Sequence, residues 1–518
     1  MSLYKSLLSL FLIAGTLSGC LKDGKITISS TENAVVATST SSNGNSIQVG
    51  PFRRLSQTSG ASATSNDQIQ NFPQPIKIGN WLYFIAWDNS FVTRWYKTDG
   101  VTVAQLSTNS TKASNAAVDS YTYPANQLAA GTTKIIFTAT NSTFNSRIYV
   151  IDTSSSDAIT ELDSGDPYTS YQTGTWWAAI NGSLWFEGYN GSDSRLFRIN
   201  LSNNTTTMLA DTNMGSDDYC QGYVGSGGNL YYISKVTTSS YQYFKYDGAA
   251  TTALQTTTNP SDNAAPIMGW SIGGNLYFKA FDGLGSGFGT LQFYRYAGSL
   301  ANPGISTSDT VVGVLGSKLI YYDIAALKSY DDTGNTIVTL ADTYAGNNDW
   351  PSNATILGSD VFFRSSNNTG LTKSYRYNGV TTAQLSSTSP IASDGSAPFY
   401  SGNDGKIYYM SQNASAYSKM YSYDPGTTNV AQVLDLNPGS NDVIDMATFR
   451  GGTSKLLFSA QNLSGYYKYY LVDGASASQI TNVNVGASDY ADSSFMLGNV
   501  PIFSFYISVP GYTALFVY

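Results

Sequence analysis

The stretch "PIMGWSIGGNLYFKAFDGLGSGFGTLQFYRYAGS", from Pro266 to Ser299, contains three short apolar segments separated by glycine-rich turns. The segments run from Ile267 to Ile272, from Leu276 to Phe281 and from Leu291 to Tyr296. Aromatic and β-branched residues favour strands, while Gly, Asn, Asp and Ser favour the turns between them. The stretch therefore predicts three strands of one antiparallel sheet, with a fourth strand after the Ala-Gly-Ser turn.

The second of these segments recurs along the whole chain as an apolar triplet that follows a Gly, Asn or Ser turn. The ten triplets begin at Leu82, Ile135, Leu184, Leu230, Leu276, Leu319, Val361, Ile407, Leu456 and Pro501. The first and last triplets are 501 − 82 = 419 residues apart over nine steps, which gives a mean period of about 47 residues. This period is typical of a four-stranded propeller blade. The sequence predicts an all-β fold, a β-propeller of about ten four-stranded blades.

A second recurring pattern is a hairpin near the end of each unit. "YKTDGVTVAQLS" starts at Tyr96 and "YRYNGVTTAQLS" starts at Tyr375, six units further on. Asp-Gly and Asn-Gly between apolar runs are strong signals for a tight hairpin. Asp99 and Asn378 are therefore predicted to form turns between the third and fourth strands and not to act in catalysis.

The two ends of the chain predict how the ring closes. "FRRLSQTSG", from Phe52, has the pattern of a fourth strand but follows no first three strands, and the chain stops at Tyr518 in the pattern of a third strand. An N-terminal strand that completes the last blade would close the ring and leave no exposed edge between blades. We expect one propeller over residues 46–518. Two rings of five blades are one alternative, and fewer blades or an irregular array is the other. The short sixth unit, from Leu319 to Asp342, is where the count would fail.

The first residues, "MSLYKSLLSLFLIAGTLSGC", have the features of a secretory signal peptide: a basic start, a short apolar core and small residues before a cysteine. Leu17 to Cys20 resembles the bacterial lipobox. We expect a lipoprotein signal peptide over 1–19, acylation of Cys20 by palmitate-like chains, and a flexible Ser/Thr-rich tether over 20–45. Because Leu21 and not Asp follows the cysteine, analogy with bacterial sorting rules suggests the outer membrane or cell surface.

The composition excludes several classes of function. There is no histidine, so Ser-His-Asp and Cys-His mechanisms are excluded. The formal net charge of −8 disfavours nucleic acid as a partner. Cys20 and Cys220 are the only cysteines, so we expect no disulfide framework. We expect a monomer without a resident cofactor, although an enzyme that uses a pair of carboxylates needs no histidine and stays open.

Two stretches carry a resemblance to a known family. "LYFIAWDNSFVTRWYKTDGVT", from Leu82, and "LDLNPGSND", from Leu434, resemble the bacterial ELWxTDGT-repeat proteins, which are hyalin-like, propeller-like proteins of the cell surface. The resemblance covers about Ser46 to Tyr518. It implies a cell-surface lipoprotein with a propeller fold, and it implies no catalytic residues.

One aspartate precedes the predicted inner strand of every unit. These connector aspartates are Asp67, Asp119, Asp166, Asp217, Asp262, Asp309, Asp349, Asp394, Asp442 and Asp489. In a propeller, the connections before the inner strands and those between second and third strands emerge on one face, which we call the connector face. Each carboxylate could cap its own turn. Alternatively, the ten could form an electronegative rim that binds a basic partner or cations, with calcium the natural candidate.

Four tryptophans fall near the same face: Trp176, Trp177, Trp270 and Trp350. Aromatic rings beside Asn, Asp and Ser suit a sugar, because the ring covers C–H surface while polar groups bond hydroxyls. Packing between blades or in the channel is the alternative, with Trp350 the one we expect to be exposed because it abuts a polar turn. The candidate ligand-binding residues are these four tryptophans together with Asp217, Asp262, Asp349, Asp394 and Asp442.

The sequence therefore favours a lipid-anchored envelope or cell-surface propeller that serves as a binding or adhesion module for a glycan or a protein. A carboxylate-based glycosidase or lyase acting on glycans is one alternative. A structural scaffold of the envelope is another.

Overall fold

The computed structural model shows strands and turns and no helix in the residues that it describes. The described residues are 27–31, 34–40, 46–54, 75–87, 93–106, 133–140, 146–155, 157–162, 177–189, 192–203, 205–209, 212–213, 216–236, 241–254, 269–281, 291–385, 392–394, 398–433, 435–473, 476–481, 488–489, 491–507 and 512–518. Within these ranges no helix is long and apolar enough to cross a membrane.

The described strands form ten sheets, which follow one another along the chain as blades. Blade one consists of β4 (Ile76–Ile78), β5 (Trp81–Trp87), β6 (Thr93–Thr98) and β7 (Val103–Gln105). Blade two consists of β8 (Lys134–Thr140), β9 (Ser146–Asp152) and β10 (Ala158–Glu161). Blade three consists of β11 (Trp177–Ile180), β12 (Ser183–Tyr189), β13 (Ser194–Asn200) and β14 (Thr205–Met208). Blades four and five are β15 (Gln221–Ser226), β16 (Asn229–Lys235), β17 (Tyr241–Tyr246) and β18 (Thr251–Leu254); and β19 (Trp270–Ile272), β20 (Asn275–Phe281), β21 (Leu291–Tyr296) and β22 (Leu300–Ala301).

The second half of the chain repeats the pattern. Blades six and seven are β23 (Thr310–Leu315), β24 (Lys318–Tyr322), β25 (Leu327–Asp331) and β26 (Thr336–Ala341); and β27 (Ser352–Leu357), β28 (Asp360–Ser366), β29 (Thr372–Tyr377) and β30 (Thr382–Gln384). Blades eight and nine are β31 (Tyr400–Ser401), β32 (Ile407–Gln412), β33 (Ser418–Asp424) and β34 (Asn429–Gln432); and β35 (Ile444–Gly451), β36 (Lys455–Gln461), β37 (Tyr467–Asp473) and β38 (Ser476–Gln479). Blade ten contains β39 (Ala491–Leu497), β40 (Val500–Ile507) and β41 (Tyr512–Val517).

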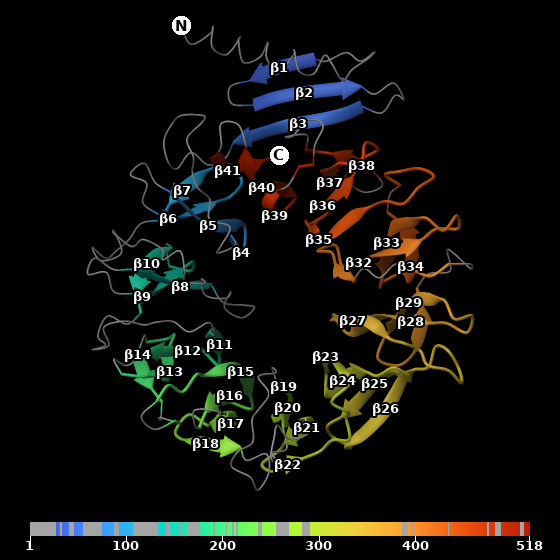
Figure 1. Cartoon of the computed structure of the whole chain (residues 1–518). Coiled ribbons are helices and arrows are strands. Elements are labelled where there is room, and N and C mark those ends of the chain that lie inside the picture. The colour runs from blue at the N-terminus through green and yellow to red at the C-terminus, as the bar shows by residue number, and fades with distance from the viewer. Residues whose placement is uncertain are drawn as a thin grey trace.

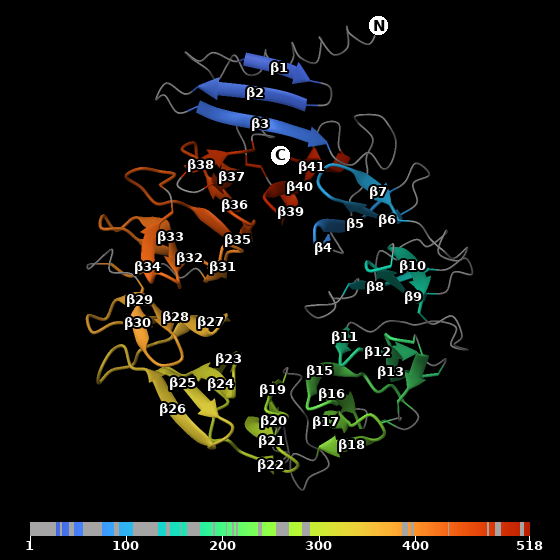
Figure 2. The same cartoon turned by 180° about the vertical axis from the view of Figure 1, so that it is seen from behind.

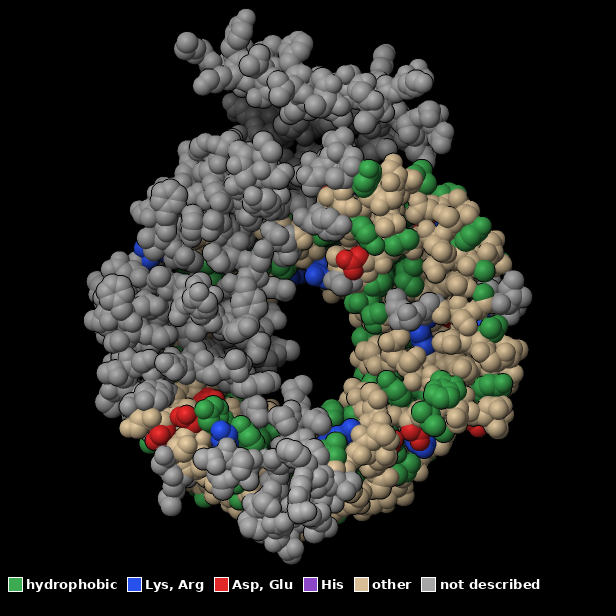
Figure 3. Space-filling view, viewed as in Figure 1, with side chains coloured by type: hydrophobic (Ala, Val, Ile, Leu, Met, Phe, Trp, Pro, Cys, Tyr) green, Lys and Arg blue, Asp and Glu red, His purple; other side chains and the backbone are tan. Residues whose placement is uncertain are grey.

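The blades are arranged around a central axis in a closed ring (Figures 1 and 2). An opening runs through the middle of the ring, and charged side chains are few on the described part of the face in view (Figure 3). The prediction of a β-propeller with about ten blades is confirmed. The short sixth unit forms a complete four-stranded sheet, β23-β24-β25-β26.

The ring closes through the N-terminal part of the chain. Strand β3 (Ser46–Arg54) pairs antiparallel with β41, with Arg53 opposite Val517 and Arg54 opposite Phe516. The last blade is therefore completed by a strand from the other end of the chain, as the sequence predicted.

Two further strands extend this closing sheet outward. Strands β1 (Thr27–Thr31) and β2 (Ala34–Thr40) pair with each other, and β2 pairs with β3. Both lie within residues 20–45, which the sequence predicted to be a flexible tether, so that prediction needs correction for these segments. The physical reason is that the Val and Thr residues of "AVVATST" favour a strand once an open edge is available to pair with.

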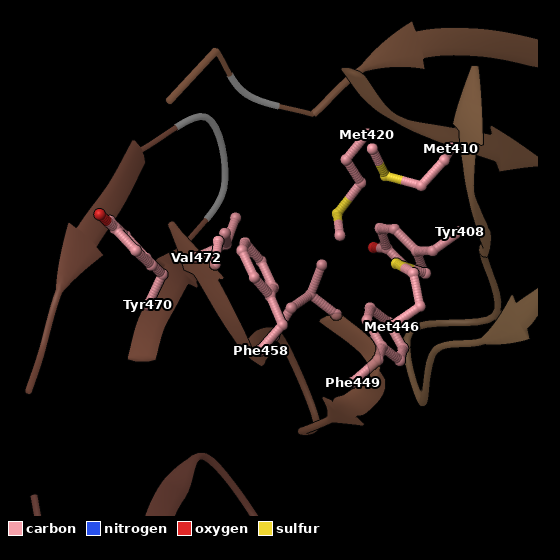
Figure 4. Packing of buried hydrophobic residues seen from close by; sticks show 10 residues of the cluster. Tyr408, Met410, Met420, Met446, Phe449, Phe458, Tyr470 and Val472 are labelled. Atoms are coloured by element: carbon pink, nitrogen blue, oxygen red, sulfur yellow. The ribbon is translucent and has the colours of Figure 1, made fainter. Parts of the chain in front are cut away.

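The core lies between neighbouring blades. In Figure 4, Tyr408 and Met420 of blade eight face Phe449 and Phe458 of blade nine, and all four side chains are buried. Burial of each large apolar side chain contributes about 1.5–3 kcal/mol. The recurring apolar triplet therefore holds each blade to the next, which is why it is the most regular feature of the sequence.

Polar clamps add to this packing on the face opposite the connector face. The hydroxyl of Tyr83 in blade one donates to Asp157 Oδ1 in blade two at 2.7 Å. In blade five, the hydroxyl of Tyr277 and Arg295 Nε both donate to Asp332 of blade six, the latter at 2.7 Å. The two clamps occupy equivalent positions, so the same device fixes the angle between two different pairs of blades.

The predicted hairpin formers also act as turns. Asp99 Oδ1 accepts hydrogen bonds from the backbone N–H groups of Val101 at 2.8 Å and Thr102 at 2.7 Å. Asn378 Oδ1 accepts the equivalent bonds from Val380 and Thr381 at 3.0 and 2.8 Å. These backbone bonds, that of Thr102 first, lower the pKa of the Asp99 carboxyl below its ordinary value. The predicted role of Asp99 and Asn378 as turn formers is therefore confirmed.

Candidate functional site

The connector aspartates within the described residues are largely buried. Asp309, Asp349, Asp394, Asp442 and Asp489 all have less than a tenth of their surface exposed. Asp67, Asp119, Asp166 and Asp262 lie outside the described residues, and so does the prediction that Asp262 contacts a ligand.

The carboxylates of Asp349 and Asp442 close the loop that leaves the preceding blade. Asp349 accepts backbone hydrogen bonds from Thr343 at 2.9 Å and Tyr344 at 2.8 Å. Asp442 accepts the equivalent bonds from Leu436 at 3.3 Å and Asn437 at 2.9 Å. In both cases the donors are the residues six and five positions before the aspartate. This geometry favours the turn-capping interpretation over an open electronegative rim.

Asp394 serves the same purpose with different donors. Its Oδ2 accepts from the backbone of Ser374 at 2.8 Å, and its Oδ1 accepts from the hydroxyl of Ser411 at 2.6 Å. Ser374 belongs to the third strand of blade seven and Ser411 to the second strand of blade eight. The carboxylate therefore ties two blades together.

In blade four the capping residue is Asp218 and not Asp217. Asp218 is fully buried, and its Oδ1 accepts from the backbone of Thr212 at 3.2 Å and Asn213 at 3.0 Å, again six and five positions earlier. Asp217 is half-buried and accepts from the backbone of Ser194 at 2.6 Å. The sequence analysis named Asp217 for this unit, and the structure shows that its neighbour Asp218 takes the capping position.

Buried basic residues lie beside several of these carboxylates. Lys419 Nζ is 3.1 Å from Asp442 Oδ1, Lys468 Nζ is 3.2 Å from Asp489 Oδ1, and an Arg195 guanidinium nitrogen is 3.7 Å from Asp218 Oδ1. Each basic residue is the second residue of the third strand in the preceding blade.

These pairs were missed at the level of the sequence, although the spacing of 21 or 23 residues between base and acid was visible there (489 − 468, 442 − 419 and 218 − 195). The basic side chains neutralise the negative charge that the aspartates would give to an electronegative rim. Among the described residues, no group of three acidic or cysteine side chains is placed to hold a metal ion.

The four candidate tryptophans have different environments. Trp176 lies outside the described residues, and Trp177 opens β11, where it pairs with Phe186. Trp270 opens β19 and stacks on Phe293 at 6.1 Å between ring centroids, within the cluster between blades five and six. The Trp270 side chain therefore packs between blades. Trp350 is 59% exposed, as expected from its place beside a polar turn.

Trp350 has a structural twin in Tyr219, which the sequence-based reasoning did not single out. Each follows a buried capping aspartate, Asp349 or Asp218, and each has a left-handed backbone, with φ of 50° for Trp350 and 47° for Tyr219. Tyr219 is 45% exposed. In both blades the inner strand that follows begins with a β-bulge. One exposed aromatic side chain therefore stands just before the inner strand in blade four and one in blade seven.

The left-handed conformation is unfavourable for both residues. It costs an L-residue roughly 1–2 kcal/mol, and a bulky side chain in it is a true outlier. Pro351 adds a second restriction at Trp350, because a residue before proline is driven towards extended conformations. Neither ring recovers this cost by burial. Strained residues of this kind cluster at functional sites, so the two aromatic side chains are the leading candidates for ligand contact.

Polar and apolar groups surround Trp350. Its backbone N–H donates to the carbonyl of Ile324 at 3.0 Å, and the Ile324 side chain is also exposed. Asn347 and Asn348, in the turn before Asp349, are exposed. We call Trp350, Ile324, Asn347 and Asn348 the Trp350 platform: an exposed aromatic side chain with exposed asparagines two and three residues before it.

Charged groups surround Tyr219. Lys235 Nζ lies 3.8 Å from the centre of its ring, and the Asp217 carboxylate, by its charge and a hydrogen bond to the hydroxyl, raises the pKa of Tyr219. Glu187 of β12 lies nearby with 8% of its surface exposed. Burial raises the pKa of the Glu187 carboxyl, and the charges of Asp217 and Asp218 add to the effect. We call Tyr219, Lys235, Asp217 and Glu187 the Tyr219 platform.

Glu187 and Lys235 could not be recognised as site residues from the repeat alone. The residue directly after the apolar triplet is acidic in the third unit and in no other unit. That departure from the repeat was the available signal.

Comparisons with known proteins give similarity of fold only. No family model matches the chain, and no curated protein sequence matches it. Among solved structures, the dipeptidyl peptidase 4 of Porphyromonas gingivalis is 10% identical with a TM-score of 0.41, over 85% of this chain and 64% of that one. A puromycin hydrolase mutant is 12% identical with a TM-score of 0.30, over 70% of this chain and 59% of that one. The β-propeller domain of the Trilobed protease from Pyrococcus furiosus is 11% identical with a TM-score of 0.29, over 62% of this chain and 98% of that domain. The chain thus spans less than two thirds of the first two.

Proposed function

We propose that the protein is a binding module that holds a glycan on its connector face. The observation that carries the proposal is the pair of exposed aromatic side chains, Trp350 and Tyr219, held outward in the same unfavourable backbone conformation. The same unfavourable conformation occurs at two equivalent positions, and its cost is best explained by a contact that each side chain makes with a ligand outside the chain.

Sugar recognition fits the chemistry of both platforms. An indole or phenol ring covers the apolar C–H face of a pyranose, while amides and charged groups bond its hydroxyls. Asn347 and Asn348 supply amides beside Trp350, and Lys235 and Asp217 supply a donor and an acceptor beside Tyr219. A flat aromatic face also suits a protein partner, which is the alternative ligand.

Attachment to the bacterial envelope is part of the same proposal. It rests on the signal-like residues 1–19 and on Cys20 in its lipobox-like context. Acyl chains on Cys20 would hold the propeller at a membrane surface, with the outer membrane or cell surface as the expected location. Metabolic labelling with a palmitate analogue, compared between the wild type and Cys20→Ser, tests it: the label and the membrane fraction should both be lost in the variant.

A glycan array followed by calorimetric titration tests the binding. The wild type should bind one or more glycans, and Trp350→Ala should weaken that binding by about 10- to 100-fold, the loss of an anchoring aromatic side chain. Val380→Ala is the matched control, because Val380 is 84% exposed in a hairpin on the opposite face. Full binding by Trp350→Ala and Tyr219→Ala would contradict the proposal.

A carboxylate-based glycan-processing enzyme is the second candidate, and Glu187 is the observation that favours it. A carboxyl group with a raised pKa near a second carboxylate is the arrangement that glycosidic bond cleavage uses, with one group as the acid. A product assay on any glycan that binds separates the two functions. Turnover that is lost in Glu187→Gln, with binding retained, would establish the enzyme and overturn the binding-only function.

A further inference from the structure

We propose that the ligand is a polymeric glycan that lies across the Tyr219 and Trp350 platforms at the same time. This inference rests on the proposed function and goes beyond it, because it states the size and form of the ligand. Three features of the structure support it: the separation of the platforms, their openness, and their repetition.

The two platforms belong to blades four and seven, which have two blades between them. Tyr219 precedes β15 of blade four and Trp350 precedes β27 of blade seven, with β19 and β23 between them along the rim of the channel (Figure 1). Along this arc the neighbouring inner strands contact one another, β15 with β19, β19 with β23 and β23 with β27. Packed sheets lie about 10 Å apart, so three steps give an arc of roughly 30 Å. A monosaccharide or disaccharide cannot span this distance.

Neither platform encloses a ligand. The rings of Trp350 and Tyr219 are about half exposed, and the neighbouring Ile324, Asn347 and Asn348 are exposed as well. Sites for small molecules bury about 70–90% of the ligand surface in a concave pocket. A single sugar on one of these open faces would keep much of its surface in water and would bind weakly.

A chain that reaches both platforms avoids this weakness. Once one segment is held, the second contact is intramolecular, and avidity can exceed either single affinity by about 10²–10⁴ without any new contact. Both platforms also lie on the same face, because both follow a capping aspartate in the connection before an inner strand. An extended polymer can therefore cross the mouth of the channel and lie on both rings.

The experiment uses the full-length protein and chains of defined length. The probes are soluble xylan, pectin, alginate and laminarin, each compared with its own disaccharide by titration. The polymer that binds should bind about 100-fold more tightly than its disaccharide. Trp350→Ala and Tyr219→Ala should each lower the affinity for the polymer by about 100-fold, to the level of one platform, and the double variant should lose binding.

Two further variants keep the result interpretable. Trp350→Gly removes the ring, and glycine adopts a φ of 50° without strain. It therefore tests the role of the ring even if the alanine variant folds poorly. Val380→Ala should bind the polymer like the wild type.

The outcomes separate the inference from the proposed function. A disaccharide that binds as tightly as its polymer, with binding lost in Trp350→Ala, would overturn the inference and leave glycan binding intact. Loss of all binding in either single variant would also overturn it, since one platform would then be the whole site. Binding of an unfolded polypeptide such as casein, with no binding of any glycan probe, would overturn both.

Discussion

Lys419 Nζ lies 3.1 Å from Asp442 Oδ1, and both side chains are shielded from solvent. Lys419 belongs to the third strand of blade eight, and Asp442 caps the loop that leads into blade nine. The pair therefore fixes the connection between two blades from the inside. Burial raises the pKa of Asp442, while the bond from Asn437 and the ammonium of Lys419 lower it in part.

Replacement of Lys419 by Met should destabilise the protein by about 3–5 kcal/mol, because it leaves a buried carboxylate without its counter-charge. The measurement is the shift of the urea unfolding midpoint. Lys455→Met is the control, since the Lys455–Asp473 pair, also at 3.1 Å, is largely open to solvent and should contribute less than about 1 kcal/mol. Equal effects in the two variants would contradict the structural role of the buried pair.

Glu187 gives a prediction for pH. Its pKa is raised in the folded protein, so the folded state holds the proton more tightly than the unfolded chain, whose glutamate pKa is about 4.3. The stability associated with the protonated carboxyl is complete below that value and is lost as the pH rises through the folded pKa. Glu187→Gln should therefore flatten the fall in unfolding midpoint from acidic towards neutral pH. Parallel curves for the wild type and the variant would show that Glu187 does not titrate this way.

Trp350 tests the link between strain and function. Trp350→Gly and Trp350→Ala both remove the ring, but only alanine keeps a Cβ in the left-handed conformation. The glycine variant should be the more stable of the two by about 1 kcal/mol, the reverse of the usual order. Both should lose glycan binding on this platform. Thermal unfolding measures the first effect and titration the second, and an alanine variant as stable as the glycine variant would argue against backbone strain.

The strands could be predicted from the sequence because their signal is local. The segment from Leu291 to Tyr296 is strand β21, and the segment from Leu276 to Phe281 is β20 apart from Asn275 at its start. Of the predicted inner strand, the structure shows Trp270–Ile272 as β19, while Ile267 and Met268 lie outside the described residues.

The site depended on information that is not local. The sequence could place an aspartate in each connection, but it could not show that Asp218 and not Asp217 is buried, because both lie in the same turn. The pairing of Lys419 with Asp442 bridges 23 residues and two blades. The exposure of Tyr219 goes with its left-handed backbone, with φ of 47°, which a one-dimensional pattern does not encode.

Closure of the ring by β3 gives the last prediction. Because β3 pairs with β41, its removal breaks the link between the two ends of the ring, whereas removal of β1 and β2 only moves the outer edge of this sheet from β1 to β3. Deletion of residues 27–54 should lower the thermal unfolding midpoint and cause association that grows with protein concentration, measured by light scattering. Deletion of residues 27–40, which removes β1 and β2 but keeps β3, is the matched control and should remain monomeric, with an unfolding midpoint close to that of the wild type. If the two deletions behaved alike, the ring would be held by packing between blades alone, without help from the strand that joins its ends.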